Sequence, residues 1–343
     1  MSERSDDFFM NMALEEARRG IGLTAPNPAV GAIVVKDGEV LGRGWHQKSG
    51  QPHAEREALA DVVRNGHTAE GATIYVTLEP CSTQGRTGAC TSAITEHQLA
   101  RCVYAATDPN PAHAGAGRKV LERAGLKVSQ GVCQAEAEHL IRAFAMVQTQ
   151  SRPWVIAKTA MSLDGRITRP PGEPQWLTSP ECRERVQALR AECDAILTGG
   201  ATVRADDPAL TIRGAHLKEG KKQPYRAVMT RAGLAGDFQI LTDENSERTL
   251  VFENSEALGV LKSLKDRGVN TVLLEAGGEL IGHFKDLGLI DEWVIFLAPL
   301  LTGGDKAAVA GTGASVPGEA LELVEIDYER IGDDLMLRAL SKR

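Results

Sequence analysis

Apolar residues in the first half of the chain form short runs separated by polar turns. The stretch AIVVKDGEVLGRGWH, residues 32–46, is predicted to be a β-hairpin, because Asp37 and Gly38 make a turn pair between two apolar runs. HAEREALADVVRNG is predicted to be a helix that stops at Gly66. The other predictions are helices over 11–19, 91–99 and 117–125 and strands over 73–80 and 101–109. Strands that alternate with helices indicate a layered α/β sheet.

A polar stretch that contains a proline, VQTQSRPW at 147–154, interrupts this alternation. A second alternation follows, with a helix predicted over 180–192 and strand-containing segments over 153–165, 193–200, 225–230, 250–254, 271–284 and 292–301. A chain of 343 residues with 42% hydrophobic residues is long enough for two cores. We therefore predict two α/β domains, residues 1–147 and 148–343.

Composition narrows the classes of partner. The net charge is −7 and only 4% of residues are aromatic, whereas nucleic-acid binders usually carry a basic stripe and stacking aromatics. No apolar run approaches the roughly 18 residues of a membrane span, and the N-terminus shows no signal-peptide pattern. We expect a cytoplasmic protein that acts on small molecules and binds neither nucleic acid nor membrane.

Candidate metal ligands come from two segments. PHAEREAL supplies His53, and LEPCSTQGRTGAC supplies Cys81 and Cys90, with eight residues between the two cysteines. One imidazole and two thiolates would leave the fourth position of a zinc ion open for water, as in catalytic zinc sites. Glu55 lies two residues after His53, off its helix face, and is a candidate proton carrier. Each residue alone is as well explained as a buried thiol or a helix-start residue, but their order matches a zinc deaminase.

Longer motifs carry a family resemblance. LEPCSTQGRTGAC, APNPAVGAIVV, GRGWHQKSGQPHAE and TDPNP in the first half, and KTAMSLDGRI, EPQWLTS, LRAECDAILTGGATVRADDPALTIR and EAGGEL in the second, resemble the bifunctional deaminase–reductases of bacterial riboflavin biosynthesis. The resemblance implies a cytidine-deaminase-like three-layer α/β/α domain followed by a dihydrofolate-reductase-like α/β domain. It also implies hydrolytic deamination of 2,5-diamino-6-ribosylamino-4(3H)-pyrimidinone 5′-phosphate, and then NADPH-dependent reduction of the ribosyl group to ribityl.

The resemblance implies site residues by position. In the deaminase, His53, Cys81 and Cys90 would hold Zn²⁺, Glu55 would carry protons, and Asn27 and His46 would bind substrate. The NADPH contacts would be Ala160, Trp176, Thr202, Asp206, Gly277, Gly278, Glu279, Leu280, Ile281, Gly282 and His283. The reductase substrate contacts would be Lys158, Pro174, Arg190, Leu210, Arg213 and Glu275. Gly85, Arg86 and Gly88 suit a tight turn with a cation for phosphate.

The second half has no Gly-x-Gly-x-x-Gly after a strand, which disfavours a Rossmann dinucleotide site. Gly277 and Gly278 instead follow the predicted strand TVLLE and precede a helix, where backbone N–H groups attract phosphate. TGGATV offers a second such turn, although Gly-Gly turns also serve as plain connections. Lys158 and Asp206 are candidates for proton transfer or for positioning the substrate.

Two departures from the family pattern concern the reductase. Pro174 replaces a serine that donates to the substrate, and Thr230 and Arg231 stand where the family often has an aspartate. Arg231 is a candidate for the 2′-phosphate of NADPH. The alternatives are a reductase-like half that has lost activity or serves only binding or oligomerisation, and a nucleic-acid deaminase. We also expect a homo-oligomer, and we interpret Cys102, Cys133, Cys182 and Cys193 as core or incidental residues.

Overall fold

The computed structural model describes residues 5–83, 88–167 and 176–342. The chain divides into two compact units, Met1–Ser151 and Arg152–Arg343. The polar stretch that begins at residue 147 is helical as far as Gln150, because it continues helix α5 (Gln134–Gln150). Thr149 and Gln150 are exposed at the end of that helix, and Ser151 ends it with a positive φ of 55°.

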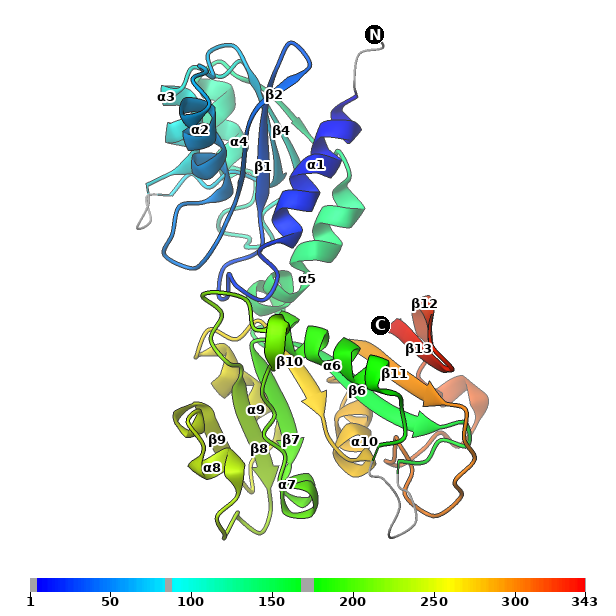
Figure 1. Ribbon diagram of the computed structural model, residues 1–343. Coiled ribbons are helices and arrows are strands. Elements are labelled where there is room, and N and C mark those ends of the chain that lie inside the picture. The colour runs from blue at the N-terminus through cyan, green and yellow to red at the C-terminus, as the bar shows by residue number, and fades with distance from the viewer. Residues whose placement is uncertain (1–4, 84–87, 168–175, 343) are drawn as a thin grey trace. The chain divides into compact units, whose positions relative to one another are not determined.

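The first unit contains a five-stranded sheet in the order β2-β1-β3-β4-β5 (Figure 1). Strand β1 (Gly31–Lys36) is antiparallel to β2 (Glu39–Trp45) and β3 (Thr73–Leu78), whereas β3, β4 (Arg101–Ala106) and β5 (Lys127–Gln130) are parallel. The predicted hairpin is confirmed, since Asp37 and Gly38 both have positive φ between the paired residues Lys36 and Glu39.

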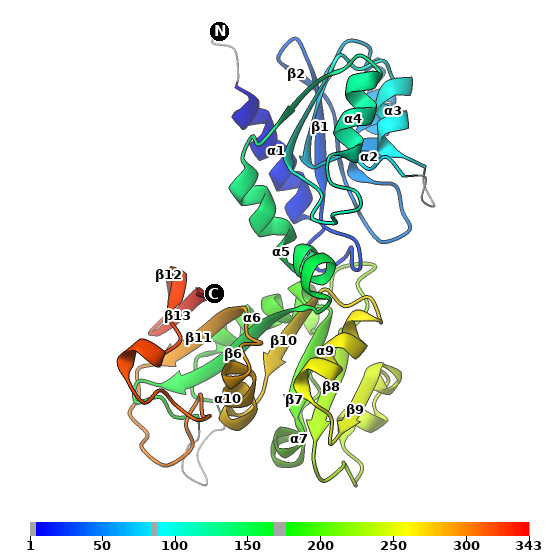
Figure 2. The same cartoon turned by 180° about the vertical axis from the view of Figure 1, so that it is seen from behind.

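Helices cover both faces of this sheet. Helix α1 (Asp6–Arg18) and α5 lie on one face, and α2 (Ala54–Arg64), α3 (Cys90–Glu96) and α4 (Ala116–Arg123) lie on the other (Figures 1 and 2). The prediction of a three-layer α/β/α unit is confirmed. Helix α1 begins five positions before the predicted residue 11, because Ser5 caps it and acidic residues fill its first turn.

Helix α2 packs directly on strand β2, and this fixes the part of the helix that carries His53 and Glu55. A Cβ atom on Gly42 would lie 2.5 Å from the carbonyl oxygen of Ala58, and one on Gly44 would lie 2.3 Å from the Ala58 nitrogen. Both distances are too short for a side chain, so glycine is required for this contact. Gly66, with a φ of 78°, follows the end of α2 as predicted.

The second unit contains an eight-stranded sheet in the order β12-β13-β11-β6-β10-β7-β8-β9. Strands β11, β6, β10, β7, β8 and β9 are parallel, and β13 joins β11 and β12 antiparallel. The bounds are β6 (Trp154–Ser162), β7 (Ala195–Gly199), β8 (Tyr225–Thr230), β9 (Thr249–Glu253), β10 (Thr271–Glu275), β11 (Glu292–Ala298), β12 (Leu323–Ile331) and β13 (Asp334–Ser341).

The helices of this unit are α6 (Pro180–Glu192), α7 (Gly200–Asp206), α8 (Gln239–Thr242), α9 (Ala257–Lys265) and α10 (Gly278–Asp286). Short 3₁₀ turns occupy Gly214–His216, Ser246–Arg248 and Pro317–Glu319. The segment TGGATV joins the end of strand β7 to the first turn of helix α7, as the predicted strand-to-helix turn requires. Gly199 ends the strand, and Gly200 begins the helix at a point where a Cβ atom would lie 2.6 Å from Thr230 Oγ1.

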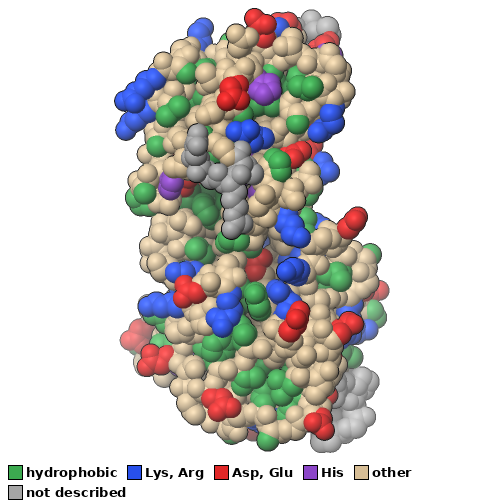
Figure 3. Space-filling model, turned by 90° about the vertical axis from the view of Figure 1, so that its left-hand side faces the viewer, with side chains coloured by type: hydrophobic (Ala, Val, Ile, Leu, Met, Phe, Trp, Pro, Cys, Tyr) green, Lys and Arg blue, Asp and Glu red, His purple; other side chains and the backbone are tan. Residues whose placement is uncertain are grey.

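The surface has mixed charge. On the face shown in Figure 3, acidic side chains lie among the basic ones on both units. None of the helices within the described part of the chain has the length and apolarity that spanning a membrane requires.

Candidate active site

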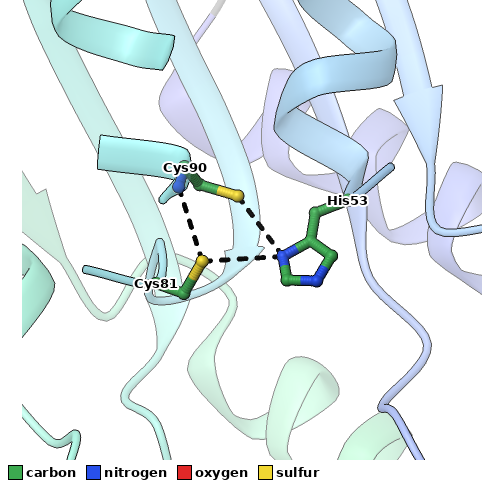
Figure 4. Close-up of side chains that lie close together, drawn as sticks. All are labelled: His53, Cys81 and Cys90. Carbon is green, nitrogen blue, oxygen red and sulfur yellow. Dashed lines mark hydrogen bonds between the residues drawn. The ribbon is translucent and has the colours of Figure 1, made fainter. Parts of the chain in front are cut away.

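The three predicted metal ligands meet although they come from three different elements (Figure 4). His53 is the N-cap of α2, Cys81 follows strand β3 after Glu79 and Pro80, and Cys90 is the first residue of α3. His53 Nδ1 lies 3.6 Å from Cys81 Sγ and 3.3 Å from Cys90 Sγ. The candidate ligand atoms all lie within 4.8 Å of one another.

These separations fit a tetrahedral zinc ion. With Zn–S near 2.3 Å and Zn–N near 2.0 Å, a tetrahedral ion separates sulfur from nitrogen by about 3.5 Å. A soft thiolate pair with one imidazole is also the donor set that zinc prefers over hard cations. The residues present therefore fit zinc, with one coordination position left for water.

The three candidate ligands shift one another's pKa values. A hydrogen bond from Cys90, together with bonds from His53 and the Cys90 N–H, lowers the pKa of the Cys81 thiol to about 4. The hydrogen bond to Cys81 also raises the pKa of His53. Cys90 donates to Cys81 and is buried, and both effects raise the pKa of Cys90 above its ordinary value.

Zinc binding should therefore release protons, because ligation needs a neutral His53 and a Cys90 thiolate. Both pKa values are raised, so protons compete with zinc increasingly as pH falls. We expect apparent zinc affinity to fall from about pH 8 to about pH 6. Competition with a chromophoric chelator, alongside proton release in weak buffer, measures both. A pH-independent affinity would contradict this arrangement.

Glu55 is buried one residue into α2 and interacts with Cys90. Burial raises the pKa of Glu55, and the neighbouring Cys81 thiolate raises it further. A carboxyl group whose pKa is moved toward neutrality can both accept and donate a proton near pH 7. The structure therefore places a proton carrier beside the candidate metal position.

Asn27 and His46 lie next to each other at the same site. His46 Nδ1 lies 3.0 Å from the carbonyl oxygen of Pro52, so this nitrogen must carry the proton. His46 Nε2 then accepts from Asn27 Nδ2 at 3.0 Å. Burial lowers the pKa of His46, which keeps the ring neutral. The rings of His46 and His53 are 5.3 Å apart, so the predicted substrate pair borders the candidate metal ligands.

Some predicted residues lie outside the described ranges. These are Gly85 and Arg86 of the cysteine spacer and Pro174 of the second unit. Gly88 is described and has a φ of 74°, as a turn glycine would.

Sequence reasoning missed Glu79, which immediately precedes Pro80 and Cys81. Its buried carboxylate accepts hydrogen bonds from the backbone N–H groups of Asp108, Gly115 and Arg118. It therefore holds the loop after β4 and the start of α4 against the strand that leads to Cys81. An acidic residue at the end of an apolar strand was the available signal.

In the second unit, three of the predicted substrate residues form one ionic network. Glu275 Oε1 lies 3.0 Å from Arg190 Nη2 and 3.5 Å from Lys158 Nζ, and Glu275 Oε2 accepts from Arg190 Nε at 3.0 Å. Lys158 and Glu275 are register neighbours on β6 and β10. Burial alone would raise the pKa of Glu275, but the two cations lower it to about 2. Glu275 therefore orients two cations.

Arg190 also connects this network to the loop that carries two further predicted contacts. Its Nη1 donates to the carbonyl oxygen of Thr211 at 3.0 Å. Leu210, before Thr211, is buried with a positive φ of 47°, and Arg213, after it, is exposed. Of the six predicted reductase substrate residues, Lys158, Arg190 and Glu275 are therefore connected by ionic hydrogen bonds. Leu210 and Arg213 lie on the loop that Arg190 contacts, and the sixth residue is Pro174.

The predicted cofactor residues lie mostly at the carboxyl ends of neighbouring parallel strands. Thr202 and Asp206 belong to α7 after β7, Arg231 follows β8, and Gly277 follows β10 as the N-cap of α10. A Cβ atom on Gly277 would lie 3.9 Å from Thr202 Oγ1, so the first turns of the two helices are adjacent. Ligands of open α/β sheets bind at such an edge.

Other predicted cofactor residues serve packing. A Cβ atom on Gly278 would lie 2.0 Å from the Ala307 carbonyl oxygen, one on Gly282 would lie 2.3 Å from the Ala310 carbonyl carbon, and Ile281 is in the core. Any cofactor contact at these positions would therefore have to use the backbone. Leu280 and Ala160 are partly exposed, whereas Glu279, His283 and Trp176 are exposed, with Arg183 stacked over the Trp176 ring.

The remaining cysteines are free thiols. Cys102 and Cys193 are fully buried, and Cys182 donates to Asp334 Oδ2 at 3.2 Å. Cys133 is partly buried before α5.

Two family models match the chain. A cytidine and deoxycytidylate deaminase zinc-binding region matches residues 3–106, and a RibD C-terminal domain matches residues 153–337. The riboflavin biosynthesis protein RibD of Escherichia coli is 39% identical, covering 98% of this chain and 99% of that protein. The chain belongs to the RibD family.

Further members of the RibD family are similar to this chain over almost its whole length. The protein of Mycobacterium tuberculosis is 38% identical over 99% of this chain and 98% of its own length. The structure of Acinetobacter baumannii RibD has a TM-score of 0.90 at 36% identity, covering 98% of this chain and 99% of that chain. The Thermotoga maritima diaminohydroxyphosphoribosylaminopyrimidine deaminase/5-amino-6-(5-phosphoribosylamino)uracil reductase has a TM-score of 0.88 at 32% identity, covering 98% of each chain. The predicted deaminase and reductase domains are confirmed.

Proposed function

We propose that the first unit deaminates 2,5-diamino-6-ribosylamino-4(3H)-pyrimidinone 5′-phosphate, and that the second unit then uses NADPH to reduce the ribosyl group of the product to ribityl. The observation that carries this proposal is the cluster of His53, Cys81 and Cys90 beside a buried Glu55. The substrates are small molecules, and a homo-oligomer and a cytoplasmic location remain predictions.

In the deaminase, His53, Cys81 and Cys90 would hold a zinc ion, which would supply the polarisation that makes water nucleophilic near neutral pH. Glu55 would take a proton from the attacking water as the water adds to the carbon that bears the 2-amino group. Glu55 then gives the proton to the departing nitrogen, so that the amine leaves as ammonia. Its raised pKa, caused by burial, suits both transfers.

Asn27 and His46 would hold the substrate beside this proton carrier. Because His46 accepts a hydrogen bond from Asn27 Nδ2, the side-chain oxygen Oδ1 of Asn27 remains to accept a hydrogen bond from the pyrimidine. His46 is fixed by Pro52 O, immediately before His53 in the chain. This arrangement couples the position of the substrate to that of the first metal ligand.

In the reductase, Lys158 and Arg190 provide N–H donors for the sugar or its phosphate. Glu275, the last residue of β10, holds Lys158 of the middle of β6 and Arg190 of α6 next to each other. NADPH would lie along the edge formed by α7 and the first turn of α10, where backbone N–H groups favour its phosphates. The nicotinamide supplies the hydride, and the protein aligns it with the sugar.

Purified protein with the diamino substrate tests the proposal. Ammonia should appear without NADPH and should stop when zinc is chelated, and NADPH should be consumed only after ammonia is released. Cys90→Ser should lose both bound zinc and ammonia release. Full deamination by zinc-free protein would overturn the proposal for the first unit, and an absence of NADPH consumption would do so for the second.

Arg231 should determine the preference for NADPH over NADH. It is exposed at the end of β8 and forms no ion pair with a described residue, so its guanidinium is available to a 2′-phosphate. Arg231→Ala should raise the KM for NADPH by roughly ten-fold or more while leaving that for NADH nearly unchanged. Arg267→Ala removes an exposed cation after α9 and is the matched control. Equal weakening of both cofactors would exclude Arg231 as the selectivity residue.

A further inference from the structure

The spacer between the two cysteine ligands raises a problem of positioning. A spacer of two residues fixes two cysteines through the local turn that joins them, but here eight residues separate Cys81 and Cys90. A longer flexible connection costs more entropy to order and constrains its ends less. Some contact outside the spacer must therefore hold the Cys90 end in place.

Part of this support comes from Cys81 itself. The N–H of Thr91 donates to the Cys81 carbonyl oxygen at 3.2 Å, and the N–H of Cys90 lies 3.4 Å from Cys81 Sγ. Both bonds depend on α3 already being in position. They do not join the spacer to the helix that carries His53 and Glu55.

Arg56, directly after Glu55, makes that connection. Its Nη2 donates to the carbonyl oxygen of Ala89 at 3.0 Å, and Ala89 is the N-cap of α3 immediately before Cys90. The Nε atom of Arg56 is buried without a hydrogen-bond partner among the described residues, whereas the side chain as a whole is partly buried.

Gly88 allows this approach. A Cβ atom at position 88 would lie 2.8 Å from Arg56 Nη2, and the backbone there has a φ of 74°. The glycine thus provides both the turn that leads into α3 and the space for the guanidinium.

We infer that Arg56 is a positioning residue of the deaminase site, which fastens the Cys90 end of the long spacer to the first turn of α2. Three residues at the start of α2 then serve the site. His53 is a ligand, Glu55 is the proton carrier, and Arg56 connects the helix to the third ligand, Cys90. The inference rests on the proposed zinc site and adds a residue that holds its geometry.

The test compares Arg56→Met, which keeps the apolar stem, with Arg56→Lys in the full-length protein. Arg64→Met is the matched control, because Arg64 lies at the other end of α2, is exposed and pairs with Asp61. Zinc affinity by chelator competition and the absorption spectrum of the Co²⁺-loaded protein report the ligand geometry directly. Ammonia release gives kcat and KM, circular dichroism and thermal unfolding verify that the first unit is folded, and NADPH oxidation of the deaminated pyrimidine verifies the second.

Arg56→Met should weaken zinc binding by roughly 10–100-fold and change the cobalt–thiolate absorption, since partners that hold metal ligands contribute this much. Its kcat for ammonia release should fall more than its KM changes. Arg56→Lys should recover part of the loss, and Arg64→Met should match the parent protein. If Arg56→Met binds zinc and cobalt like the parent, the inference is overturned, whereas a parent that binds no zinc would instead overturn the proposed function. Should Arg56→Met fail to fold, the cobalt spectrum of Arg56→Lys decides, and a spectrum identical to the parent's would overturn the inference.

Discussion

Glu55→Gln should abolish ammonia release while leaving zinc bound, with kcat reduced by roughly 10²–10⁴-fold or more. The amide keeps the shape of the buried side chain but cannot take a proton from water or return one to the leaving nitrogen. Because His53, Cys81 and Cys90 are unchanged, zinc content should stay near that of the parent. Metal analysis and an ammonia assay on the same preparation measure both quantities.

The same variant separates the two units. Glu55→Gln should still oxidise NADPH when given the deaminated pyrimidine, because none of the reductase residues is altered. Glu57→Gln, a matched charge change in the same first turn of α2, should deaminate at the parent rate. Near-normal ammonia release by Glu55→Gln would show that another group carries the protons. Loss of NADPH oxidation in a folded Glu55→Gln protein would mean that the two reactions share one site.

Glu275→Gln should have the opposite effect, with loss of reduction and retention of ammonia release. The amide leaves Arg190 and Lys158 adjacent and uncompensated in a setting where each side chain is at most 16% exposed. Removing one partner from a buried ionic network should lower the free energy of unfolding of the second unit by about 3 kcal/mol. Urea unfolding, followed together with both activities, measures the effect.

The pH dependence of this contribution follows from the pKa of Glu275. Its folded-state pKa of about 2 is below its ordinary value of 4.5, so the ionised carboxylate stabilises the folded state. The contribution should be complete above about pH 4.5 and should be lost as pH falls toward about 2. Glu322→Ala, which breaks an exposed pair with Lys342, is the control and should change stability little. Equal stability of Glu275→Gln and the parent at neutral pH would contradict the network.

Local signals in the sequence were sufficient for the elements next to the deaminase site. Asp37 and Gly38 fix a hairpin because few residue pairs adopt two consecutive positive φ angles. Gly66 ends α2 because glycine adopts a positive φ without strain. The types and order of His53, Cys81 and Cys90 indicated a zinc site because few other sites use this donor set. These are properties of single residues and short motifs, so they can be seen without the fold.

Longer elements were harder to define. Polar residues from 147 suggested an interruption, yet α5 continues to Gln150 because a helix tolerates exposed glutamine and threonine until Ser151 changes the backbone. The glycines of TGGATV predicted a turn between a strand and a helix, and β7 ends at Gly199 where α7 begins at Gly200. The close approach of Thr230 that requires glycine at position 200 is visible only in the fold.

By itself, the sequence determined which residue types could carry the chemistry, because donor atoms and turn-forming residues are local properties. The tertiary structure decided which of them meet and in what state. It brought His53, Cys81 and Cys90 within 4.8 Å, raised the pKa of Glu55 by burial and bound both oxygens of Glu275 to cations. It also showed that Gly278 and Gly282 permit close packing against the backbone of Ala307 and Ala310, and it revealed Arg56 beside Ala89. Distances between residues far apart in the chain, and the desolvation that shifts a pKa, arise only when the elements pack together.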